Sequence, residues 1–251
     1  MKLGPYILGP NDTPENGIYI GDAMELAKSI PDESVDVAVL DPPYGVSWRC
    51  ARRTASERFA AIPGDDVIST DWLVELYRVL KPIAAAFIFT RWDVMEEWRR
   101  AIQHAGLTVK NCIVWDKGFH GCGDLFGAFA PQHEMVLFAV RGKFRLNRRL
   151  PDVIRVNRIN PNELIFPAQK PVALMSHLLE GATSDGDVII DWFTGSGTVP
   201  VACRQMTRRY LAFEIDPTTA ELARERVRNT QPPLFVADVR PEQLAMEIGV
   251  G

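Results

Sequence analysis

Short apolar runs alternate with amphipathic stretches along this chain of 251 residues. Runs rich in β-branched and aliphatic residues predict strands at residues 18–20, 35–40, 84–89, 109–115, 134–140, 188–190, 210–213 and 234–236. Two of these runs, 35–40 and 188–190, are apolar almost throughout, which is typical of parallel strands that are buried on both faces. Strands that alternate with helical patterns predict an α/β fold.

Helices are predicted between these runs from apolar residues at helical spacing. Asp22 followed by Glu25 forms a capping box, which favours a short helix directly after the first strand. The expected helix starts are Asp22, Thr70 or Asp71, Asp93, Pro171 and Asp216, and the expected ends include Pro82, Gly106, Gly181 and Val227.

Two stretches, residues 46–66 and 141–164, match neither pattern, and each carries a cluster of basic residues. The whole chain has 28 Lys and Arg against 32 Asp and Glu, so these clusters lie on an otherwise acidic protein. Long irregular segments in a compact domain are usually functional. We therefore expect one domain over residues 1–251 with two excursions that contact a polyanion, although solvated loops would look the same. The arginines expected to make this contact are Arg49, Arg52, Arg53, Arg145, Arg148, Arg149, Arg155 and Arg158.

Several classes of protein are disfavoured by the composition. No apolar run approaches the roughly 18 residues of a membrane span, and the first residues lack the apolar core of a signal peptide. The four cysteines include no Cys-x-x-Cys pair, which argues against a zinc site or a disulfide framework. We expect a cytoplasmic protein that holds no metal.

A glycine turn, Asp191-Trp192-Phe193-Thr194-Gly195-Ser196-Gly197-Thr198, follows the strand predicted at 188–190 and precedes a helical run. Glycines in such a turn let a ligand approach the backbone closely. Glu214 ends the next predicted strand, where an acid typically accepts hydrogen bonds from ribose hydroxyls. Together they predict an adenosine-containing cofactor, whereas the simplest alternative is a tight turn without a ligand.

The details of this turn narrow the choice of cofactor. Pro200 stands where a dinucleotide-binding turn has its third glycine, and proline offers no backbone N–H to a pyrophosphate. The lysine of a nucleotide-triphosphate loop is also missing from the turn. A cofactor without phosphate, such as S-adenosylmethionine, fits better.

A stiff turn, Asp41-Pro42-Pro43-Tyr44, follows the buried strand at 35–40. Its two prolines remove backbone donors, so its carbonyls point outward unpaired. Asp41 adds a carboxylate acceptor and Tyr44 an aromatic face, a combination that suits a planar substrate bearing an amino group. Two acceptors that hold the amino hydrogens would favour a more tetrahedral nitrogen, whose lone pair can attack an electrophile. The alternative is a turn that only ends the strand.

Taken together, the two turns resemble those of the amino-methylating DNA methyltransferases, which move a methyl group from S-adenosylmethionine to adenine N6 or cytosine N4. The Asp-Pro-Pro-Tyr turn comes first here, as in the circularly permuted β group. Ile20-Gly21-Asp22-Ala23 resembles a further cofactor motif of the family, in which Asp22 would receive the adenine amino group. His133-Glu134, which opens a predicted strand, is also similar to the family.

The segment Phe166-Pro167-Ala168-Gln169-Lys170-Pro171 resembles the family motif that holds the methionine end of the cofactor. Lys170 is retained as the expected partner of the cofactor carboxylate, while Phe166 and Ala168 depart from the commonest form. The resemblance thus assigns Asp41, Pro42, Pro43 and Tyr44 to catalysis. It assigns to the cofactor Asp22, Ala23, Asp41, Lys170, Phe193, Thr194, Gly195, Ser196, Gly197, Thr198 and Glu214.

The resemblance implies a Rossmann-like fold, with a mostly parallel sheet of seven strands, helices on both faces and both turns at carboxyl ends of strands. It implies double-stranded DNA as partner, with the target base flipped out of the helix. On this basis, replacing Arg148 and Arg149 with Ala is expected to weaken DNA binding and flatten its salt dependence. The resemblance also implies a bacterial or phage-infected cell as the setting. A homodimer and a cognate restriction endonuclease stay open as further partners.

The expected reaction is methylation of adenine N6, because Asp-Pro-Pro-Tyr is commoner in adenine-specific members of the family. Cytosine N4 methylation is the alternative, and an inactive relative or one directed at RNA or a small molecule is the third. Cytosine C5 chemistry is disfavoured, since it needs a nucleophilic cysteine, usually after proline, and none of the four cysteines follows a proline.

Overall fold

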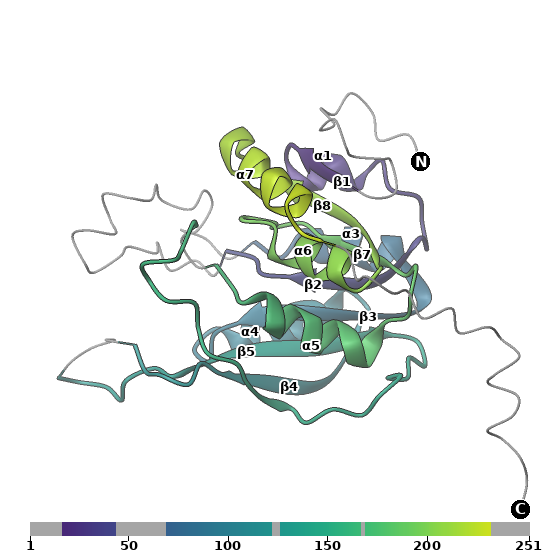
Figure 1. Ribbon diagram of the computed structural model, residues 1–251. Helices are drawn as coiled ribbons and strands as arrows, with labels where there is room; N and C mark the ends of the chain where they lie inside the picture. The colour runs from purple at the N-terminus through teal and green to yellow at the C-terminus, as the bar shows by residue number, and fades with distance from the viewer. Residues whose placement is uncertain (1–16, 44–68, 122–125, 167–168, 232–251) are drawn as a thin grey trace, which may run out of the picture.

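The computed structural model describes residues 17–43, 69–121, 126–166 and 169–231. Within them, eight strands form one sheet in the order β1-β8-β7-β2-β3-β5-β4-β6 (Figure 1). The strands are β1 (Gly17–Ile20), β2 (Val35–Leu40), β3 (Leu80–Thr90), β4 (Thr108–Asp116), β5 (His133–Arg141), β6 (Val153–Arg155), β7 (Val188–Asp191) and β8 (Arg209–Glu214). Strand β5 runs antiparallel to its neighbours β3 and β4, and the other pairings are parallel.

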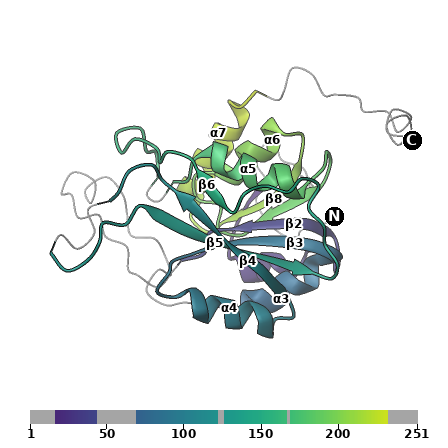
Figure 2. The same ribbon diagram turned by 90° about the horizontal axis from the view of Figure 1, so that it is seen from below.

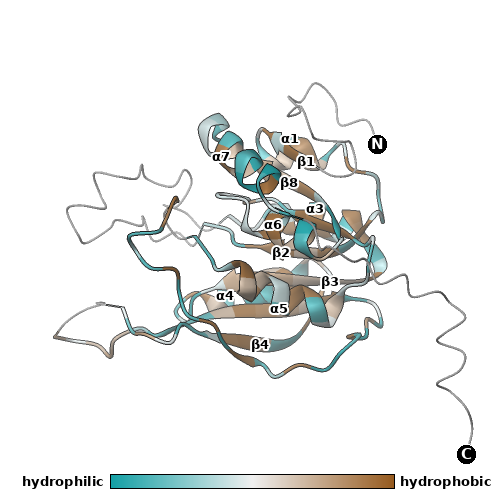
Figure 3. Ribbon diagram, in the orientation of Figure 1, coloured by the Kyte–Doolittle hydropathy of each residue, from teal (hydrophilic) through white to brown (hydrophobic). Residues whose placement is uncertain are grey.

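Helices cover both faces of this sheet and make a three-layer α/β/α arrangement (Figure 2). The helices are α1 (Ala23–Ala27), α3 (Trp72–Val79), α4 (Met95–His104), α5 (Val172–Ala182), α6 (Thr198–Gln205) and α7 (Pro217–Arg228). One apolar core joins α5, α6 and α7 to the sheet, and a second joins α1, α3 and α4 to its other face. The hydropathy colouring shows apolar central strands and a polar outer face on α7 (Figure 3). No helix among the described residues is long and apolar enough to cross a membrane.

Asp22 and Asp216 cap α1 and α7 as the sequence predicts, whereas Asp71 precedes α3 without a side-chain cap bond and α4 begins at Met95, after Val94 and not at Asp93. Asp22 accepts hydrogen bonds from the N–H groups of Met24 and Glu25 at the start of α1, at 2.9 and 3.2 Å. Asp216 accepts from the N–H of Thr219 at 2.7 Å, and Pro217 takes the first position of α7. These contacts satisfy N–H groups that a helix leaves unpaired.

The predicted end of α3 at Pro82 is wrong. The helix already ends at Val79, and Pro82 lies inside β3. The β2–β3 pairing is irregular there, since Val35 pairs with Leu80 but Val37 pairs with Ala85. A proline is tolerated at such a bulge because it need not donate to the ladder. Helix α5 likewise ends one residue later than predicted, at Ala182.

The expected sheet of seven strands is also corrected, because the described residues contain eight. The additional strand, β6, lies in the stretch 141–164 and pairs with the edge strand β4. It has three residues, of which only Ile154 is buried, so it is too short to give a strand pattern. The strand predicted at 234–236 and the whole of the excursion 46–66 lie outside the described residues.

The parallel strands end at a common edge of the sheet, which we call the carboxyl edge. It holds Ile20, Leu40, Thr90, Asp116, Arg155, Asp191 and Glu214, the last residues of β1, β2, β3, β4, β6, β7 and β8. The antiparallel β5 begins at this edge, since Met135 pairs with Thr90 and His133 with Asp116. Side chains from distant parts of the chain therefore meet there.

Candidate active site at the carboxyl edge

The two turns singled out in the sequence lie side by side at the carboxyl edge. Asp41 directly follows β2, and the glycine turn directly follows β7. These strands are neighbours in the sheet, with Val37 paired to Ile189 and Ala38 to Ile190. The parallel pairing thus joins two segments that are remote in the sequence, and it places both turns where ligands bind in open α/β sheets.

The glycine turn is held in shape by Glu214. One carboxylate oxygen of Glu214 accepts a hydrogen bond from the N–H of Gly195 at 2.8 Å, and the other accepts from the N–H of Asp216 at 3.0 Å. Burial raises the pKa of Glu214, although the backbone donors act in the opposite direction. Glu214, which is expected to accept hydrogen bonds from ribose hydroxyls, therefore also links β7, β8 and the start of α7.

Both glycines of the turn are required by their surroundings. Gly195 and Gly197 have φ values of +51° and +77°, which favour glycine. A Cβ on Gly195 would lie 2.9 Å from the ring of Phe166, and one on Gly197 would lie 2.9 Å from the Cβ of Ala223. The turn is therefore packed between the segment before α5 and helix α7, which explains its two glycines.

Arg226 of α7 braces the turn from the other side, and the sequence pattern gave no signal for it. Its guanidinium donates to the carbonyl oxygen of Ser196 at 3.0 Å, and to the hydroxyl oxygens of Ser196 and Thr198 at 3.1 and 3.2 Å. Burial lowers the pKa of this guanidinium. The side chains of Ser196 and Thr198 are buried, so they take part in holding the turn as well as lining it.

Asp191, the last residue of β7 and the first of the glycine turn, is a buried acid to which the sequence pattern assigns no role. Its side chain accepts a hydrogen bond from the N–H of Phe193 at 3.1 Å. Burial raises the pKa of Asp191 to about 8, and the neighbouring carboxylates of Asp41 and Glu214 act in the same direction. The charged form of a buried carboxylate is costly when its charged neighbours are also carboxylates.

Asp41 is paired with Lys170, which comes from the segment before α5. The Lys170 ammonium forms an ion pair with Asp41 and lies 3.4 Å from a carboxylate oxygen of Glu134, the second residue of β5. Lys117 lies 3.1 Å from the other oxygen of Glu134. Lys170, which is expected to pair with the cofactor carboxylate, thus also contacts Asp41, the predicted catalytic acid.

The charges of this group support one another. Burial acts to lower the pKa of Lys170, but the two carboxylates outweigh it and the pKa lies above its usual value. Burial acts to raise the pKa of Glu134, but Lys170 and Lys117 outweigh it and the pKa lies below its usual range. Lys170 and Glu134 are therefore charged near neutral pH.

The remaining predicted cofactor residues surround these two turns. Asp22 is exposed at the end of β1, and the N–H of Gly21 donates to the carbonyl oxygen of Glu214 at 3.0 Å. Phe193 packs edge-on against Trp72 with ring centroids 5.5 Å apart, and Ala23 is half-buried. Thr194 is buried and bonded to the backbone of Asp191. Asp22 follows β1 by two residues and Glu214 ends the adjacent β8, so both acids lie at the same stretch of the edge.

The basic cluster at 141–158 is not brought together as expected. Arg148 pairs with Glu180 at 2.5 Å near the end of α5, and Asn147 bonds to Gly181 and Ser184. This end of α5 lies opposite the carboxyl edge, so Arg148 and its neighbours Arg145 and Arg149 do not share the edge with Asp41. Strand β6 then returns the chain to the carboxyl edge, and Arg155 and Arg158 lie there.

Exposed aromatic side chains also lie at the carboxyl edge. Among the described residues, every strongly exposed tryptophan or phenylalanine lies in a connection there: Trp92 after β3, and Phe119, Phe126 and Phe129 between β4 and β5. The β4–β5 connection projects from the sheet at the left of Figure 1. None of these four was singled out from the sequence, because exposure is decided by the path of the loop.

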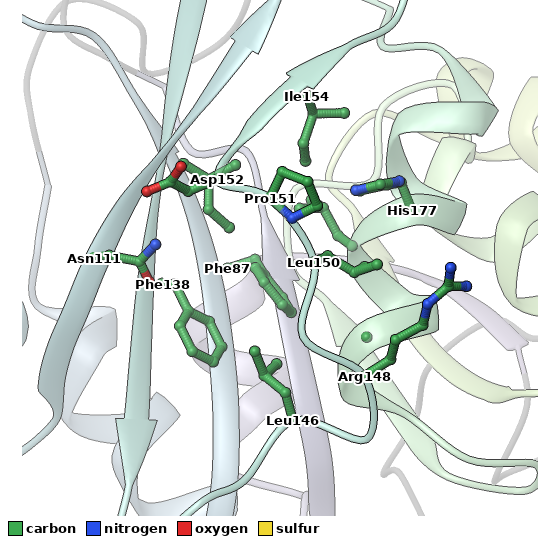
Figure 4. Close-up of a pocket in the computed structure, with 13 residues that line it drawn as sticks. Phe87, Asn111, Phe138, Leu146, Arg148, Leu150, Pro151, Asp152, Ile154 and His177 are labelled. Carbon is green, nitrogen blue, oxygen red and sulfur yellow. The ribbon is translucent and has the colours of Figure 1, made fainter.

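A small cavity of about 50 Å³ lies elsewhere, between the sheet, α5 and the segment before β6 (Figure 4). Phe87 and Phe138 line it from the strands, and His177 and Arg148 from α5 and the segment. It shares no residue with the two turns. No cluster of His, Cys, Asp or Glu within the described ranges could hold a metal ion.

Other predicted site residues lie outside the described residues. They are Tyr44 of the Asp-Pro-Pro-Tyr turn, Pro167 and Ala168 before Lys170, and the arginines Arg49, Arg52 and Arg53. Their assignments stay predictions.

Comparison with known proteins agrees with this geometry. The DNA methylase family of N6 and N4 enzymes matches residues 35–225. The type II methyltransferase M.HpaI of Haemophilus parainfluenzae is 26% identical over 235 residues, which cover 84% of this chain and 73% of that protein.

Two solved structures share the fold. The M1.HpyAVI–SAM complex has a TM-score of 0.65 at 22% identity, covering 83% of this chain and 98% of that one. The cytosine-N4-specific PvuII DNA methyltransferase has a TM-score of 0.67 at 15% identity, covering 93% and 91%. The Rossmann-like methyltransferase fold expected from the sequence is thereby confirmed, and the family match extends over most of the chain. The chain belongs to the N6/N4 DNA methylase family.

Proposed function

We propose that the protein transfers the methyl group of S-adenosylmethionine to an exocyclic amino group in double-stranded DNA, with adenine N6 as the expected acceptor. The observation that carries the proposal is the adjacency of Asp41 and the glycine turn on the paired strands β2 and β7. This arrangement puts an acceptor for amino hydrogens beside a cradle for an adenosyl group.

The residues at the edge fit S-adenosylmethionine. The carboxylates of Glu214 and Asp22 are acceptors suited to ribose hydroxyls and an adenine amino group. The turn between them is free of Cβ atoms at Gly195 and Gly197, which allows close approach to its backbone. Pro200 in the first turn of α6 offers no donor to a pyrophosphate, which disfavours a dinucleotide. When bound, the cofactor supplies an electrophilic methyl group.

Asp41 is the residue that would act on the amino group. An amino nitrogen attached to a base is a poor nucleophile, because its lone pair is delocalised into the ring. Asp41 and the backbone carbonyl of Pro42 are acceptors that can hold both amino hydrogens and favour a nitrogen with its lone pair outside the ring plane. The methylated nitrogen then loses one proton to an acceptor at this edge.

A covalent enzyme–base intermediate is not needed for this reaction. Of the described cysteines, Cys203 is buried in α6 and Cys112 lies within β4. Burial raises the pKa of both thiols, which leaves them protonated and poorly nucleophilic. This supports direct transfer to an amino group over attack at cytosine C5.

Duplex DNA as substrate is supported by the charges and aromatic groups at the carboxyl edge. Arg155 and Arg158 are exposed there and suit phosphate contacts. Exposed aromatic rings such as Phe119 and Phe129 suit stacking against bases that are displaced when one base leaves the helix. Cytosine N4 is the second candidate acceptor, since the PvuII enzyme of the same fold is cytosine-N4-specific.

The proposal is tested by mass spectrometry of nucleosides from unmethylated plasmid incubated with the protein and S-adenosylmethionine. N6-methyladenine is the expected product, and N4-methylcytosine would correct the base alone. The variant Asp41→Ala should lose turnover by about 100-fold or more while it still binds the cofactor in calorimetry. Near-normal activity of that variant would contradict the role of Asp41.

A further inference from the structure

Four side chains with alternating charge lead from the surface to Asp41. Lys117 begins the connection after β4, Glu134 lies in β5, Lys170 precedes α5, and Asp41 follows β2. The distances are 3.1 Å from Lys117 to Glu134 and 3.4 Å from Glu134 to Lys170, and Lys170 pairs directly with Asp41. Three elements other than β2 thus contribute to the surroundings of this carboxylate.

The inner part of this group is withdrawn from water. The side chain of Lys170 is 6% exposed, and its ammonium also lies over the ring of Phe89, 5.3 Å from the centroid. The Glu134 oxygen that faces Lys170 is buried and accepts no hydrogen bond from the described residues. Desolvation offsets much of the attraction in such buried pairs, so stability alone is a weak reason for the arrangement.

The geometric consequence is that one ammonium is shared by two carboxylates. If Lys170 paired with Asp41 alone, its ammonium would compete with the amino hydrogens of the base for the oxygen lone pairs of Asp41. Glu134 takes part of that interaction, and it fixes where the ammonium lies. Lys117 in turn keeps Glu134 charged from the outer side.

We propose that Glu134 is a positioning residue that holds the Lys170 ammonium between itself and Asp41 and so keeps Asp41 oriented and able to accept the amino hydrogens of the target base. This inference rests on the proposed methyl transfer, and it adds to that function a residue that does not touch base or cofactor. Glu134 acts on the reaction only through Lys170.

The test is single-turnover methyl transfer to plasmid DNA at saturating cofactor by Glu134→Gln, which keeps the shape of the side chain. We expect a rate at least about tenfold lower, since small misplacement of reacting groups is costly. The cofactor dissociation constant, measured by calorimetry, should change less than about threefold. Glu134→Asp should restore part of the rate, because it restores the charge.

Two controls separate positioning from stability. Asp36→Asn removes a carboxylate at the opposite end of β2, where Asp36 pairs with Lys81 at 2.5 Å and accepts from the N–H of Val188 at 3.0 Å. It should lower the unfolding midpoint in urea but leave the transfer rate unchanged. Lys117→Met removes the outer charge and should slow transfer far less than Glu134→Gln. Equal rate losses in Glu134→Gln and Lys117→Met would overturn the inference.

A double-mutant cycle shows whether Glu134 acts through Lys170. The free energies of unfolding of Glu134→Gln, Lys170→Met and the double variant should be non-additive, as for residues in contact. Additive effects would overturn the inference, as would a wild-type rate in Glu134→Gln. If the wild-type protein itself transfers no methyl group, the proposed function is wrong. An active wild type with an equally active Glu134→Gln contradicts only the inference.

Discussion

At the scale of single residues, the carboxyl edge concentrates acids whose protonation depends on their surroundings. Asp191 and Glu214 end β7 and β8, Asp41 follows the neighbouring β2, and each would be an ordinary surface acid elsewhere. Asp191 alone is fully enclosed, and its pKa is raised to about 8 by burial and by the other two carboxylates. In the folded protein, Asp191 therefore changes between its protonated and its charged form near neutral pH.

This property predicts a pH-dependent stability that Asp191→Asn should remove. Because the folded-state pKa is about 8, against an ordinary value of 3.8, the folded protein retains a proton that the unfolded chain releases. Below about pH 4 the stabilising effect of that proton is complete, and it is lost as pH rises to about 8, by at most about 1.4 kcal/mol per pH unit. Urea unfolding of both proteins between pH 5 and 9 measures it. Parallel curves between pH 5 and 8 would contradict the assignment.

Arg226 supplies a second prediction at this scale. Arg226→Met removes three hydrogen bonds from the glycine turn without removing a group expected to touch the cofactor. We expect roughly tenfold weaker binding of S-adenosylmethionine in calorimetry, because each bond contributes about 1 kcal/mol and part of the loss is recovered by water. Arg228→Met is the matched control, since Arg228 lies in the same helix but pairs with Glu221 at 2.7 Å. Equal affinities in the two variants would mean that the brace is not needed.

At the scale of elements, the glycine turn depends on the approach of α7 and of the segment before α5. Gly197→Ala introduces a left-handed alanine and a Cβ only 2.9 Å from Ala223. Gly186→Ala is a matched control, because Gly186 has φ +79° but no atom within 4 Å of its added Cβ. We expect the control to lose about 1–2 kcal/mol of unfolding free energy from backbone strain. Gly197→Ala should lose about 1–3 kcal/mol more from overpacking.

Urea unfolding of these two alanine variants gives the comparison directly. If they are equally destabilised, α7 does not pack on the turn as described. A larger loss in Gly197→Ala should be accompanied by weaker cofactor binding, since the displaced backbone is that of the expected binding loop.

At the scale of the whole molecule, the strand β6 divides one basic cluster between opposite edges of the sheet. Arg155 and Arg158 lie at the carboxyl edge, whereas Arg148 is tied to Glu180 at the far end of α5. The expectation for DNA binding changes accordingly. The double variant Arg155→Ala/Arg158→Ala should reduce the slope of log affinity against log salt by about 2, one for each lost phosphate contact.

The double variant Arg148→Ala/Arg149→Ala is the matched control for that measurement. It removes the same charge from the same segment of the sequence, but from the opposite edge of the sheet. Its salt slope should stay near that of the wild-type protein. A larger change in this control than in Arg155→Ala/Arg158→Ala would place the DNA on the other side of the molecule.

The fold class, most strand positions and the two turns could be predicted from the amino-acid sequence. Buried parallel strands need nearly continuous apolar runs, and β2 and β7 have them. Turns that contain two prolines or two glycines restrict backbone geometry locally, so their residues can be identified without a partner. The capping acids Asp22 and Asp216 are local in the same sense, because they bond to N–H groups two or three residues away.

Which of these residues come into contact depends on how the strands and helices pack together. The pairing of β2 with β7 brings Asp41 to the glycine turn, and the antiparallel entry of β5 brings Glu134 to Lys170. The bulge that admits Pro82, the three-residue strand β6 and the brace from Arg226 also depend on neighbours that are distant in the chain. Periodicity and spacing describe local preferences, whereas burial, charge sharing and exposure arise from packing between elements.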